Sequence, residues 1–373
     1  MDTPARGPGV YLHIPFCARR CDYCAFTTFT GRQEAIPAYL DAVLQEWAAR
    51  RAELGGERPA TVYVGGGTPS LVPAAALARV IAALDPAPGA EVTVECNPES
   101  TTPGLLAALR RAGVTRVSLG VQSIAPHVLA GLGRAHHAGA LEVAVEAIGA
   151  TGFPTYNVDL IYGGAGERDG DLVASLEAVL ALDPAPPHIS AYALTVEAGT
   201  PLARTPERHP DDDVQARRYA LCDEILEGAG LEWYEVSNWA RPTHECRHNR
   251  NYWGQGNYVG LGCAAHSHRD GVRSWNIAHL DRYIAAVSAT GAACAGAERL
   301  DGPTQARERL ELGLRTRDGV PARAFAPADL ATLTAAGLLR HVGGRVVLTR
   351  RGRLLANEVA CRLADPAPAG LAS

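Results

Sequence analysis

Three cysteines lie within eight residues near the N-terminus with the spacing C-x3-C-x2-C: Cys17, Cys21 and Cys24. Thiolates this close can ligate three irons of a four-iron cubane cluster, which normally takes four cysteines. The iron that lacks a cysteine would be open to a small molecule. The spacing therefore predicts an iron–sulfur cofactor and a place for chemistry beside it.

Spacing alone leaves two other interpretations of these cysteines open. Zinc also binds thiolates and takes four ligands, and His13 could supply the fourth, although it lies on an expected strand. The thiols could also be inert or structural. A disulfide framework suits a small secreted chain. This chain has 373 residues, and its nine cysteines show no disulfide pattern.

The composition limits the class of protein. A chain of 373 residues with 47% apolar residues predicts one large α/β domain with a smaller appendage. The formal net charge of −5 creates no overall field that favours nucleic acid or a membrane surface. No apolar run approaches the length of about 18 residues that spans a bilayer, and residues 1–8 lack the apolar part of a signal peptide. We therefore expect a cytoplasmic protein with reduced cysteines, no nucleic-acid partner and no membrane span.

The sequence contains no lysine, so every basic side chain is arginine or histidine. A lysine Schiff base is therefore impossible, which excludes pyridoxal-phosphate enzymes and Schiff-base aldolases. A phosphate loop that depends on a lysine is excluded as well.

Short β-branched runs alternate with longer helical stretches that are rich in alanine and leucine. The expected strands are Val10–His13, Thr61–Val64, Glu91–Glu95, Arg116–Leu119, Thr155–Leu160 and His188–Tyr192. The expected helices are Ile36–Leu54, Pro73–Leu84, Pro103–Ala112, Ala138–Ala150, Asp171–Leu182 and Asp211–Gly228. This alternation predicts parallel strands with crossover helices. Six units favour a partial (β/α)6 barrel, similar to an incomplete TIM barrel, and a seventh strand is expected at Glu232–Val236.

The pattern changes after about residue 295, so we expect domains at 1–295 and 296–373. The expected C-terminal elements are two helices, a small β-wing and a closing helix: Thr304–Leu314, Pro327–Ala336, Arg345–Leu348 and Arg351–Leu363. This order predicts a small winged-helix-like domain. It shows no strong basic face, so a packing or lid role is at least as well supported as DNA binding.

A glycine-rich run, Gly65-Gly66-Gly67-Thr68-Pro69-Ser70, follows the second expected strand. Glycines allow positive φ and a close approach of the backbone to a ligand. Further polar motifs lie at the ends of later strands, and in parallel α/β folds this edge is where sites form. The glycine run alone is weak evidence, because such turns are common in α/β proteins.

Together, C-x3-C-x2-C and a strand-ending GGGTP resemble the radical S-adenosylmethionine (SAM) superfamily. Further motifs resemble the oxygen-independent coproporphyrinogen III oxidase group: Tyr11–Cys17, Glu95–Pro98, Ser118–Ser123, Leu132–Arg134 and Asp159–Gly163. The resemblance runs from residue 10 to about 270 and implies a [4Fe-4S] cluster and SAM as cofactors. It also implies one-electron cleavage of SAM to methionine and a 5′-deoxyadenosyl radical.

The resemblance implies roles for individual residues. Cys17, Cys21 and Cys24 would ligate the cluster, and SAM would chelate the open iron. The residues implied to contact SAM or to flank the cluster are Tyr11, Tyr23, Gly66, Gly67, Thr68, Glu95, Gln122, Arg134 and Asp159. Each of them alone is more often a surface or capping residue. Only their shared position at strand ends favours a site.

Two departures from the oxidase pattern favour another branch of the group. The oxidases resemble C-x3-C-x2-C-x-C, whereas Phe26 stands here in place of the further cysteine. The run His248-Asn249-Arg250-Asn251-Tyr252-Trp253 is an HNxxYW motif, which is typical of the heme chaperones (HemW-like proteins). The resemblance ties this run to heme binding and favours His248 as the heme ligand. The chemistry of the side chains agrees: a neutral imidazole can ligate heme iron, Tyr252 and Trp253 could stack on a porphyrin, and Arg247 and Arg250 could pair with its propionates.

Alternatives to this heme site remain. His248 could be an ordinary loop histidine, and His266 or Cys263 could be the ligand instead. The family more often has glycine where Ala264 stands, which leaves the backbone geometry there open. We interpret Cys96 as a buried thiol at a strand end, and Cys222, Cys294 and Cys361 as small core residues. Asp211-Asp212-Asp213 is interpreted as a helix cap, and His136-His137 as a solvated pair.

We therefore expect a heme chaperone that binds a [4Fe-4S] cluster, SAM and heme, and passes heme to an unidentified acceptor protein. Peripheral contact with membrane-bound acceptors is one option. SAM cleavage stays open, so the chain need not be an enzyme. The main rival is oxidative decarboxylation of coproporphyrinogen III to protoporphyrinogen IX. A weaker rival is a radical enzyme that acts on another large substrate.

Overall fold

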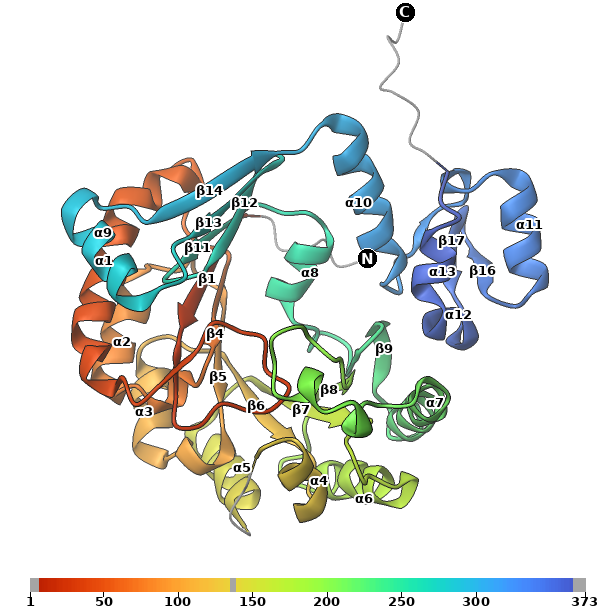
Figure 1. Ribbon diagram of the computed structural model, residues 1–373, viewed down its shortest axis with the longest axis horizontal. Coiled ribbons are helices and arrows are strands. Elements are labelled where there is room, and N and C mark those ends of the chain that lie inside the picture. The colour runs from red at the N-terminus through yellow and green to blue at the C-terminus, as the bar shows by residue number, and fades with distance from the viewer. Residues whose placement is uncertain (1–6, 135–138, 365–373) are drawn as a thin grey trace, which may run out of the picture.

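The structure is a computed structural model that describes residues 7–134 and 139–364, so the His136-His137 pair lies outside the described residues. Its main body is a curved sheet with helices packed on the outer face (Figure 1). The C-terminal residues form a smaller unit at one side. None of the helices in the described ranges has the length and apolar character that crossing a bilayer requires.

Six adjacent parallel strands form the centre of the sheet, in sequence order. They are β1 (Gly9–Ile14), β4 (Thr61–Gly66), β5 (Glu91–Cys96), β6 (Arg116–Gln122), β7 (Thr155–Tyr162) and β8 (His188–Ala193). The helices that follow them are α1 (Ile36–Arg50), α2 (Ala74–Ala83), α3 (Pro103–Arg111), α4 (Pro126–Gly131), α5 (Ala140–Thr151), α6 (Asp169–Leu180) and α7 (Asp212–Gly228). The partial (β/α)6 barrel that the sequence predicts is confirmed. Asp211 caps α7 by accepting from the Val214 amide at 2.9 Å, as expected.

Further strands extend the sheet at both edges to twelve strands, and the sequence predicted only one of them. Beyond β1 come β11 (Tyr258–Leu261), β12 (His266–Arg269), β13 (Val272–Asn276) and β14 (Cys294–Arg299); beyond β8 come β10 (Asn238–Ala240) and β9 (Glu232–Glu235). The expected strand at Glu232–Val236 is therefore confirmed as β9, but it pairs antiparallel with β10. Between these strands lie helices α8 (Arg247–Trp253) and α9 (Leu280–Thr290), and a two-stranded ribbon of β2 (Phe16–Cys17) and β3 (Phe29–Thr30) follows β1.

Alternation along the central strands separates an apolar face from a polar face. In β4, Val62 and Val64 are fully buried in the main core, where the helices pack. The intervening Thr61 and Tyr63 point to the other face, where they contact His248 and Glu95. The same face of the other strands carries Tyr11, His13, Glu91, Arg116, Ser118, Asn157, Asp159, His188 and Ser190. The interior of the barrel is therefore polar, which suits a ligand site rather than a packed core.

The small C-terminal unit is winged-helix-like, as predicted. It contains α10 (Gly302–Leu314), α11 (Pro327–Ala335), α12 (Arg350–Leu354), α13 (Ala356–Ala360), β15 (Val320–Pro321), β16 (Leu339–Val342) and β17 (Arg345–Leu348), and it has an apolar core of its own. The expected single helix Arg351–Leu363 is wrong, because Leu355 leaves the helical region at φ −115° and ψ 28°. The boundary between residues 295 and 296 stays a prediction.

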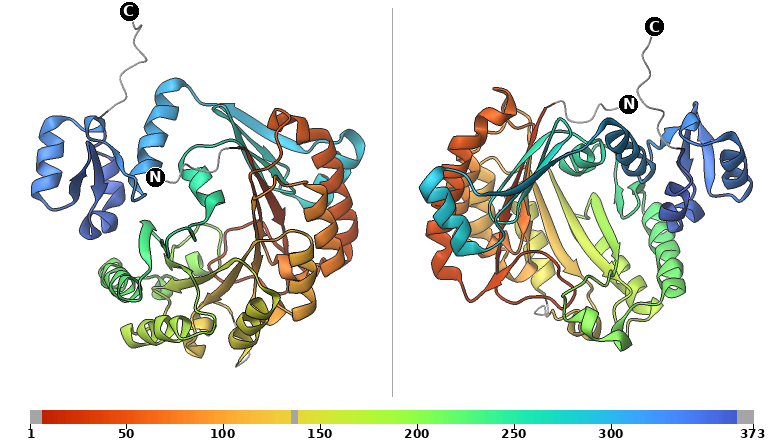
Figure 2. Two further views of the ribbon diagram at one scale, coloured as in Figure 1. Left: turned by 180° about the vertical axis from the view of Figure 1, so that it is seen from behind. Right: turned by 45° about the horizontal axis from the view of Figure 1, so that its top comes forward.

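A buried carboxylate joins this unit to the barrel, beside α7 (Figure 2). Asp223 on α7 is fully buried and accepts from both terminal nitrogens of Arg353, at 2.8 and 2.7 Å. Trp239 donates to the same carboxylate at 2.8 Å. Because a buried charge needs such partners, this contact fixes the small unit against the barrel.

The cysteines outside the N-terminal motif fall into two groups. Cys96 and Cys222 are buried, as expected. Cys294 and Cys361 are exposed, so their interpretation as core residues is wrong. The reason is position: Cys294 begins β14, the outermost strand of the sheet, and Cys361 follows the last short helix.

Candidate functional site

The three cysteines of the N-terminal motif lie on one loop that leaves the end of β1. Cys17 is buried in β2, whereas Cys21 and Cys24 are partly exposed. Thr68 donates to Cys17 Sγ at 3.7 Å, and Arg134 Nη1 donates to Cys21 Sγ at 3.8 Å. Burial raises the pKa of Cys17 and of Cys24. Donors directed at the sulfurs offset this cost for thiolates.

Asp22 anchors the cysteine loop to its surroundings. Its amide donates to Leu132 O at 3.1 Å, and its carbonyl accepts from the Leu202 amide at 2.9 Å. Its carboxylate accepts from Arg208 Nη2 at 2.8 Å. A Cβ at Gly133, where φ is +70°, would lie 2.6 Å from this carboxylate, so only glycine fits there. The loop is therefore held from three sides between Cys21 and Cys24.

The cysteines are not arranged for a single metal ion. In residues 7–134 and 139–364, no three His, Cys, Asp or Glu side chains lie close enough together to share one ion. A zinc site needs such a group, because its four ligands surround one atom at about 2.0–2.3 Å. A cubane holds its irons apart, so its cysteines stand further from one another. The described residues therefore show no zinc-type grouping at these cysteines.

The glycine run packs against the cysteine loop. The Gly67 amide donates to Ile14 O at 2.7 Å, and the Thr68 amide donates to Phe16 O at 2.8 Å. A Cβ at Gly67 would lie 2.8 Å from both carbonyl oxygens. Gly66 has φ +111°, and a Cβ there would meet the His13 ring at 2.4 Å. The glycines are therefore required for close backbone approach, whether or not they also contact SAM.

Glu95 lies at the end of β5, between the glycine run and the barrel interior. Its two oxygens accept from Tyr63 OH at 2.8 Å and from the Gly66 amide at 3.0 Å. Burial raises its pKa to about 7, against the lowering effect of these two donors, while Asp159 raises it further. The carboxyl group is thus poised to change its charge near neutral pH.

Arg134 links the cysteine loop to the neighbouring strands. Its Nη2 donates to Asn97 Oδ1 at 2.7 Å and to Gly120 O at 2.9 Å. It also interacts with Tyr23, whose pKa is raised mainly by burial. Asn97 in turn donates to Thr68 at 3.3 Å. A positive side chain therefore sits beside the cysteines, as a carboxylate-bearing ligand would require.

Gln122 is strained at the end of β6. Its φ is +69°, and the pairing of β6 with β7 shifts register next to it. A long side chain in the left-handed region costs about 1 kcal/mol or more, and such strain clusters at functional sites. This irregularity supports the prediction that the Gln122 side chain contacts a ligand.

Asp159 and Tyr11 lie deeper than the other predicted contacts. Asp159 accepts from Ser118 at 2.9 Å and from Asn157 at 2.7 Å, and burial raises its pKa. Tyr11 OH contacts His13 Nδ1 at 3.0 Å, and His13 Nε2 in turn contacts Thr27 O in the cysteine loop at 2.8 Å. The structure thus brings the cysteines, glycines and strand-end residues to one edge of the barrel, with these two just inside it. Their contacts with SAM stay predictions.

His248 lies at the opposite end of the barrel. It contacts Thr61, the first residue of β4, whereas Glu95 contacts Gly66, the last. Five residues of extended strand span about 17 Å, at about 3.3 Å each. Helix α8 therefore closes the end of the barrel where the strands begin, and it does not join the edge with the cysteines.

The His248 imidazole is fully buried, and both of its nitrogens are engaged. Nδ1 bonds Thr61 Oγ1 at 2.8 Å and Nε2 bonds Tyr252 OH at 2.8 Å. Burial lowers its pKa to about 3, so the ring is neutral. A neutral ring suits an axial heme ligand. In this conformation, however, it offers iron no free nitrogen, and ligation requires one of these bonds to open.

The other residues named for heme have partners of their own. Trp253 packs on Tyr234 with ring centroids 5.8 Å apart. Arg247 donates to Gly89 O at 2.8 Å, and Arg250 pairs with Asp318 at 3.7 Å. Their contact with a porphyrin stays a prediction.

The alternative ligands, Cys263 and His266, lie in the turn after β11 and at the start of β12. Cys263 is fully buried and its pKa is raised by burial to about 12, so it is a poor ligand. His266 is exposed on β12. Ala264 adopts φ +57°, which resolves the backbone geometry that the sequence left open. Glycine would fit this conformation better than alanine.

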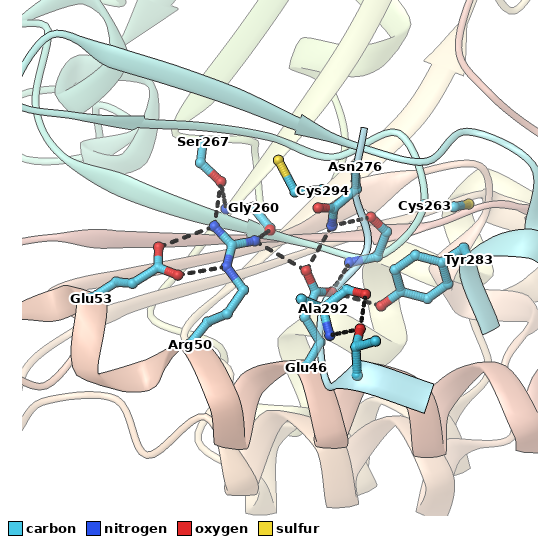
Figure 3. Close-up of polar contacts among 12 residues, drawn as sticks. Glu46, Arg50, Glu53, Gly260, Cys263, Ser267, Asn276, Tyr283, Ala292 and Cys294 are labelled. Atoms are coloured by element: carbon cyan, nitrogen blue, oxygen red, sulfur yellow. Dashed lines mark hydrogen bonds and ion pairs between the residues drawn. The ribbon is translucent and has the colours of Figure 1, made fainter. Parts of the chain in front are cut away.

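A buried carboxylate holds this turn in place (Figure 3). Glu46 on α1 is fully buried and accepts from the Gly262 amide at 2.9 Å, Asn276 at 2.7 Å and Tyr283 at 2.6 Å. Arg50 pairs with it at 3.0 Å. The network ties α1 to strands β11 and β13 and to α9. It lies between α1 and the edge strands of the sheet, and none of its hydrogen bonds involves a predicted ligand residue.

Three residues that connect the site were not predicted from the sequence: Tyr63, Thr61 and Asn97. Tyr63 and Thr61 alternate with valines in β4, and this period of two was a usable signal that they face the interior. Asn97 directly follows Glu95 and Cys96, within the motif Glu95–Pro98. It hydrogen-bonds both Thr68 and Arg134, and these contacts form only in the folded chain, so the sequence does not indicate them.

Comparisons with known proteins agree with this architecture. The profile of the Radical SAM superfamily matches residues 11–179, and the profile of the HemN C-terminal domain matches residues 300–355. Coproporphyrinogen III oxidase (HemN) from Escherichia coli has a similar structure, with a TM-score of 0.82 over 96% of this chain and 90% of that chain. The sequences are 23% identical, so this similarity speaks for the fold alone.

Curated relatives carry the name heme chaperone HemW. One from Mycobacterium tuberculosis (strain ATCC 25618 / H37Rv) is 46% identical over 95% of this chain and 94% of its own length. Another from Bacillus subtilis (strain 168) is 31% identical over 94% of this chain and 97% of its own length. A third from Escherichia coli (strain K12) is 35% identical over 69% of each chain. This chain therefore belongs to the radical SAM superfamily and, within it, to the HemW family.

Proposed function

We propose that this chain is a heme chaperone that binds a [4Fe-4S] cluster, SAM and heme and passes the heme to an acceptor protein. The observation that carries the proposal is the arrangement of two motifs around one polar barrel interior. The cysteine loop lies at the end of β1, and the HNxxYW helix α8 closes the opposite end. The name shared by the relatives supports the same function.

The residues at the cysteine edge fit the cluster and SAM. Cys17, Cys21 and Cys24 would hold three irons, and the cluster, when bound, supplies an electron to SAM. Arg134 would position a carboxylate beside the cluster, since its guanidinium already reaches Cys21 at 3.8 Å. Glu95 would bond ligand hydroxyls or amines, with its charge set by burial.

Phe26 argues against the coproporphyrinogen oxidase alternative. It stands where the oxidase pattern has a further cysteine, and 64% of its surface is exposed beside the cysteine loop. A phenyl ring cannot ligate iron. Together with the HNxxYW motif, this makes decarboxylation of coproporphyrinogen III the weaker proposal. We propose a cytoplasmic location, with heme and an acceptor protein as partners.

Anaerobic reconstitution with iron and sulfide tests the proposal directly. We expect a four-iron signal by Mössbauer spectroscopy in the wild type and its loss in the Cys17→Ser, Cys21→Ser, Cys24→Ser variant. Cys294→Ser is the matched control, because Cys294 is exposed and lies outside the motif. A wild-type protein without a four-iron signal contradicts the proposal.

Heme titration of the same reconstituted protein tests the second part. We expect a Soret band in the wild type and a shifted or lost band in His248→Ala. An unchanged spectrum contradicts the assignment of His248. Formation of protoporphyrinogen from coproporphyrinogen under reducing, oxygen-free conditions would favour the rival function.

A further inference from the structure

Two hydroxyl groups hydrogen-bond the His248 imidazole. Thr61 Oγ1 lies 2.8 Å from Nδ1, and Tyr252 OH lies 2.8 Å from Nε2. The ring also stacks on Tyr63, with centroids 5.3 Å apart and an interplanar angle of 29°. A Cβ at Gly9 would lie only 3.2 Å from His248 Cε1. The imidazole plane is therefore fixed on several sides, and only its hydrogen bonds can change easily.

The two hydroxyl partners are not equivalent. Thr61 begins β4 in the middle of the sheet and is 1% exposed, so it has little room to move. Tyr252 lies one turn after His248 on a helix of seven residues and is partly exposed. Its ring meets Tyr258 edge-on, with centroids 4.5 Å apart. Rotation of a partly exposed side chain on a short helix disturbs less than displacement of a buried strand residue.

We propose that Tyr252 masks the iron-binding nitrogen of His248 and that Thr61 positions the ring for ligation. In this scheme Nδ1 carries the proton and donates to Thr61, while Nε2 accepts from the Tyr252 hydroxyl. When Tyr252 turns away, that hydrogen bond breaks and the Nε2 lone pair becomes available to iron; no proton leaves the ring. The bond from Nδ1 to Thr61 stays and fixes the tautomer, as partners of metal-bound histidines do.

This inference rests on the proposed role of His248 as the heme ligand and adds a gate and a positioning residue to it. The gate explains how a fully buried histidine with no free nitrogen can serve as a ligand. The same masking would keep small metal ions from the nitrogen. A metal ion makes fewer contacts than a porphyrin, so it offsets less of the free energy lost when Tyr252 is displaced.

The first test uses the heme-free protein. Labelling with 15N-histidine and long-range 1H–15N spectra report the tautomer of each ring, and His248→Ala assigns the signal. We expect the Nδ1–H tautomer in the wild type and a mixture of tautomers in Thr61→Val, with Thr61→Ser restoring the wild-type signal. A wild-type His248 with its proton on Nε2 would overturn the proposal.

The second test follows heme binding by stopped-flow absorbance in the Soret region. We expect Tyr252→Phe to bind ferric heme about fivefold faster, the factor that one ordinary hydrogen bond represents. Tyr258→Phe is the control, because it keeps the neighbouring ring and leaves the bond to Nε2 intact. Equal rates for Tyr252→Phe and the wild type would overturn the gate.

The two proposals fail in different ways. Heme spectra that His248→Ala leaves unchanged overturn the ligand assignment itself. If His248→Ala loses heme while Tyr252→Phe binds heme at the wild-type rate, the assignment of His248 as the ligand is supported and the gating role of Tyr252 is wrong. Thr61→Val should weaken heme binding about fivefold. A value equal to that of the wild type would overturn the positioning role.

Discussion

The Tyr63 ring stacks on the His248 imidazole, with ring centroids 5.3 Å apart. The same Tyr63 donates its hydroxyl to Glu95 at 2.8 Å. One side chain of β4 therefore touches a residue predicted for SAM and a residue predicted for heme. Tyr63 therefore connects the two ends of the barrel through direct contacts with Glu95 and with His248.

Tyr63→Phe should raise the pKa of Glu95 above its value of about 7. The phenol donates to the ionised carboxylate and so lowers this pKa, while burial raises it. Loss of one such hydrogen bond shifts a pKa by about 0.5–1 unit.

The carboxyl stretch of 13C-glutamate in infrared spectra, followed against pH, measures this change. Tyr192→Phe is the control, because Tyr192 makes no hydrogen bond with Glu95. Identical titrations of Tyr63→Phe and the wild type would contradict the contact.

Glu95→Gln should stabilise the protein at neutral pH and leave it unchanged in acid. In the folded wild type the pKa is about 7, whereas in the unfolded chain it is about 4.3. The folded state thus holds the proton more tightly, and its stability falls as pH rises from about 4.5 to about 7. Glutamine carries no charge, so it avoids a cost of about 3–4 kcal/mol.

Denaturant unfolding at pH 4.5, 6 and 8 measures this difference. The free energy of unfolding of Glu95→Gln minus that of the wild type should grow between pH 4.5 and 7 and then level off. Asp41→Gln is a suitable control, because Asp41 is exposed. A difference that stays constant with pH would mean that Glu95 does not titrate in this range.

Much of the fold follows from local patterns. The six central strands lie where short β-branched runs alternate with helical periods, because tertiary packing reinforces these preferences. Strands β11 to β14 escaped prediction for a physical reason. Strands β11 to β13 are short, and polar residues such as His266 and Arg273 interrupt them, so their strand state depends on pairing with β1 and with one another.

The candidate site was predictable in part. The shared edge of cysteines, glycines and strand-end residues follows from the rule that parallel strands end together. The position of His248 does not follow, because α8 lies between two irregular segments and its docking depends on the contacts of His248 with Thr61 and Tyr63 in β4. No local signal in the sequence indicates that a buried histidine there has both nitrogens engaged.

Ala264→Gly should raise the stability of the protein by about 0.5–1 kcal/mol. Ala264 adopts φ +57°, where a Cβ adds steric strain of about 1 kcal/mol that glycine avoids. Thermal unfolding measures the change. Ala265→Gly is the matched control: Ala265 is buried and has no positive φ, so this variant should lose stability. A destabilised Ala264→Gly would show that the Cβ packing outweighs the strain.

Asp22→Asn should release a reconstituted cluster faster than the wild type does. The carboxylate of Asp22 pairs with Arg208 at 2.8 Å, and both side chains are about a quarter exposed, at 28% and 26%. Asparagine keeps the shape and loses the charge, so the pair should weaken by about 1 kcal/mol, or about fivefold. The backbone bonds of Asp22 to Leu132 and Leu202 remain, so the protein should stay folded.

The decay of cluster absorbance in the presence of an iron chelator measures the release. Asp41→Asn, which breaks an exposed pair with Arg79, should decay as the wild type does, and equal decay of Asp22→Asn would show that the loop needs no such anchor.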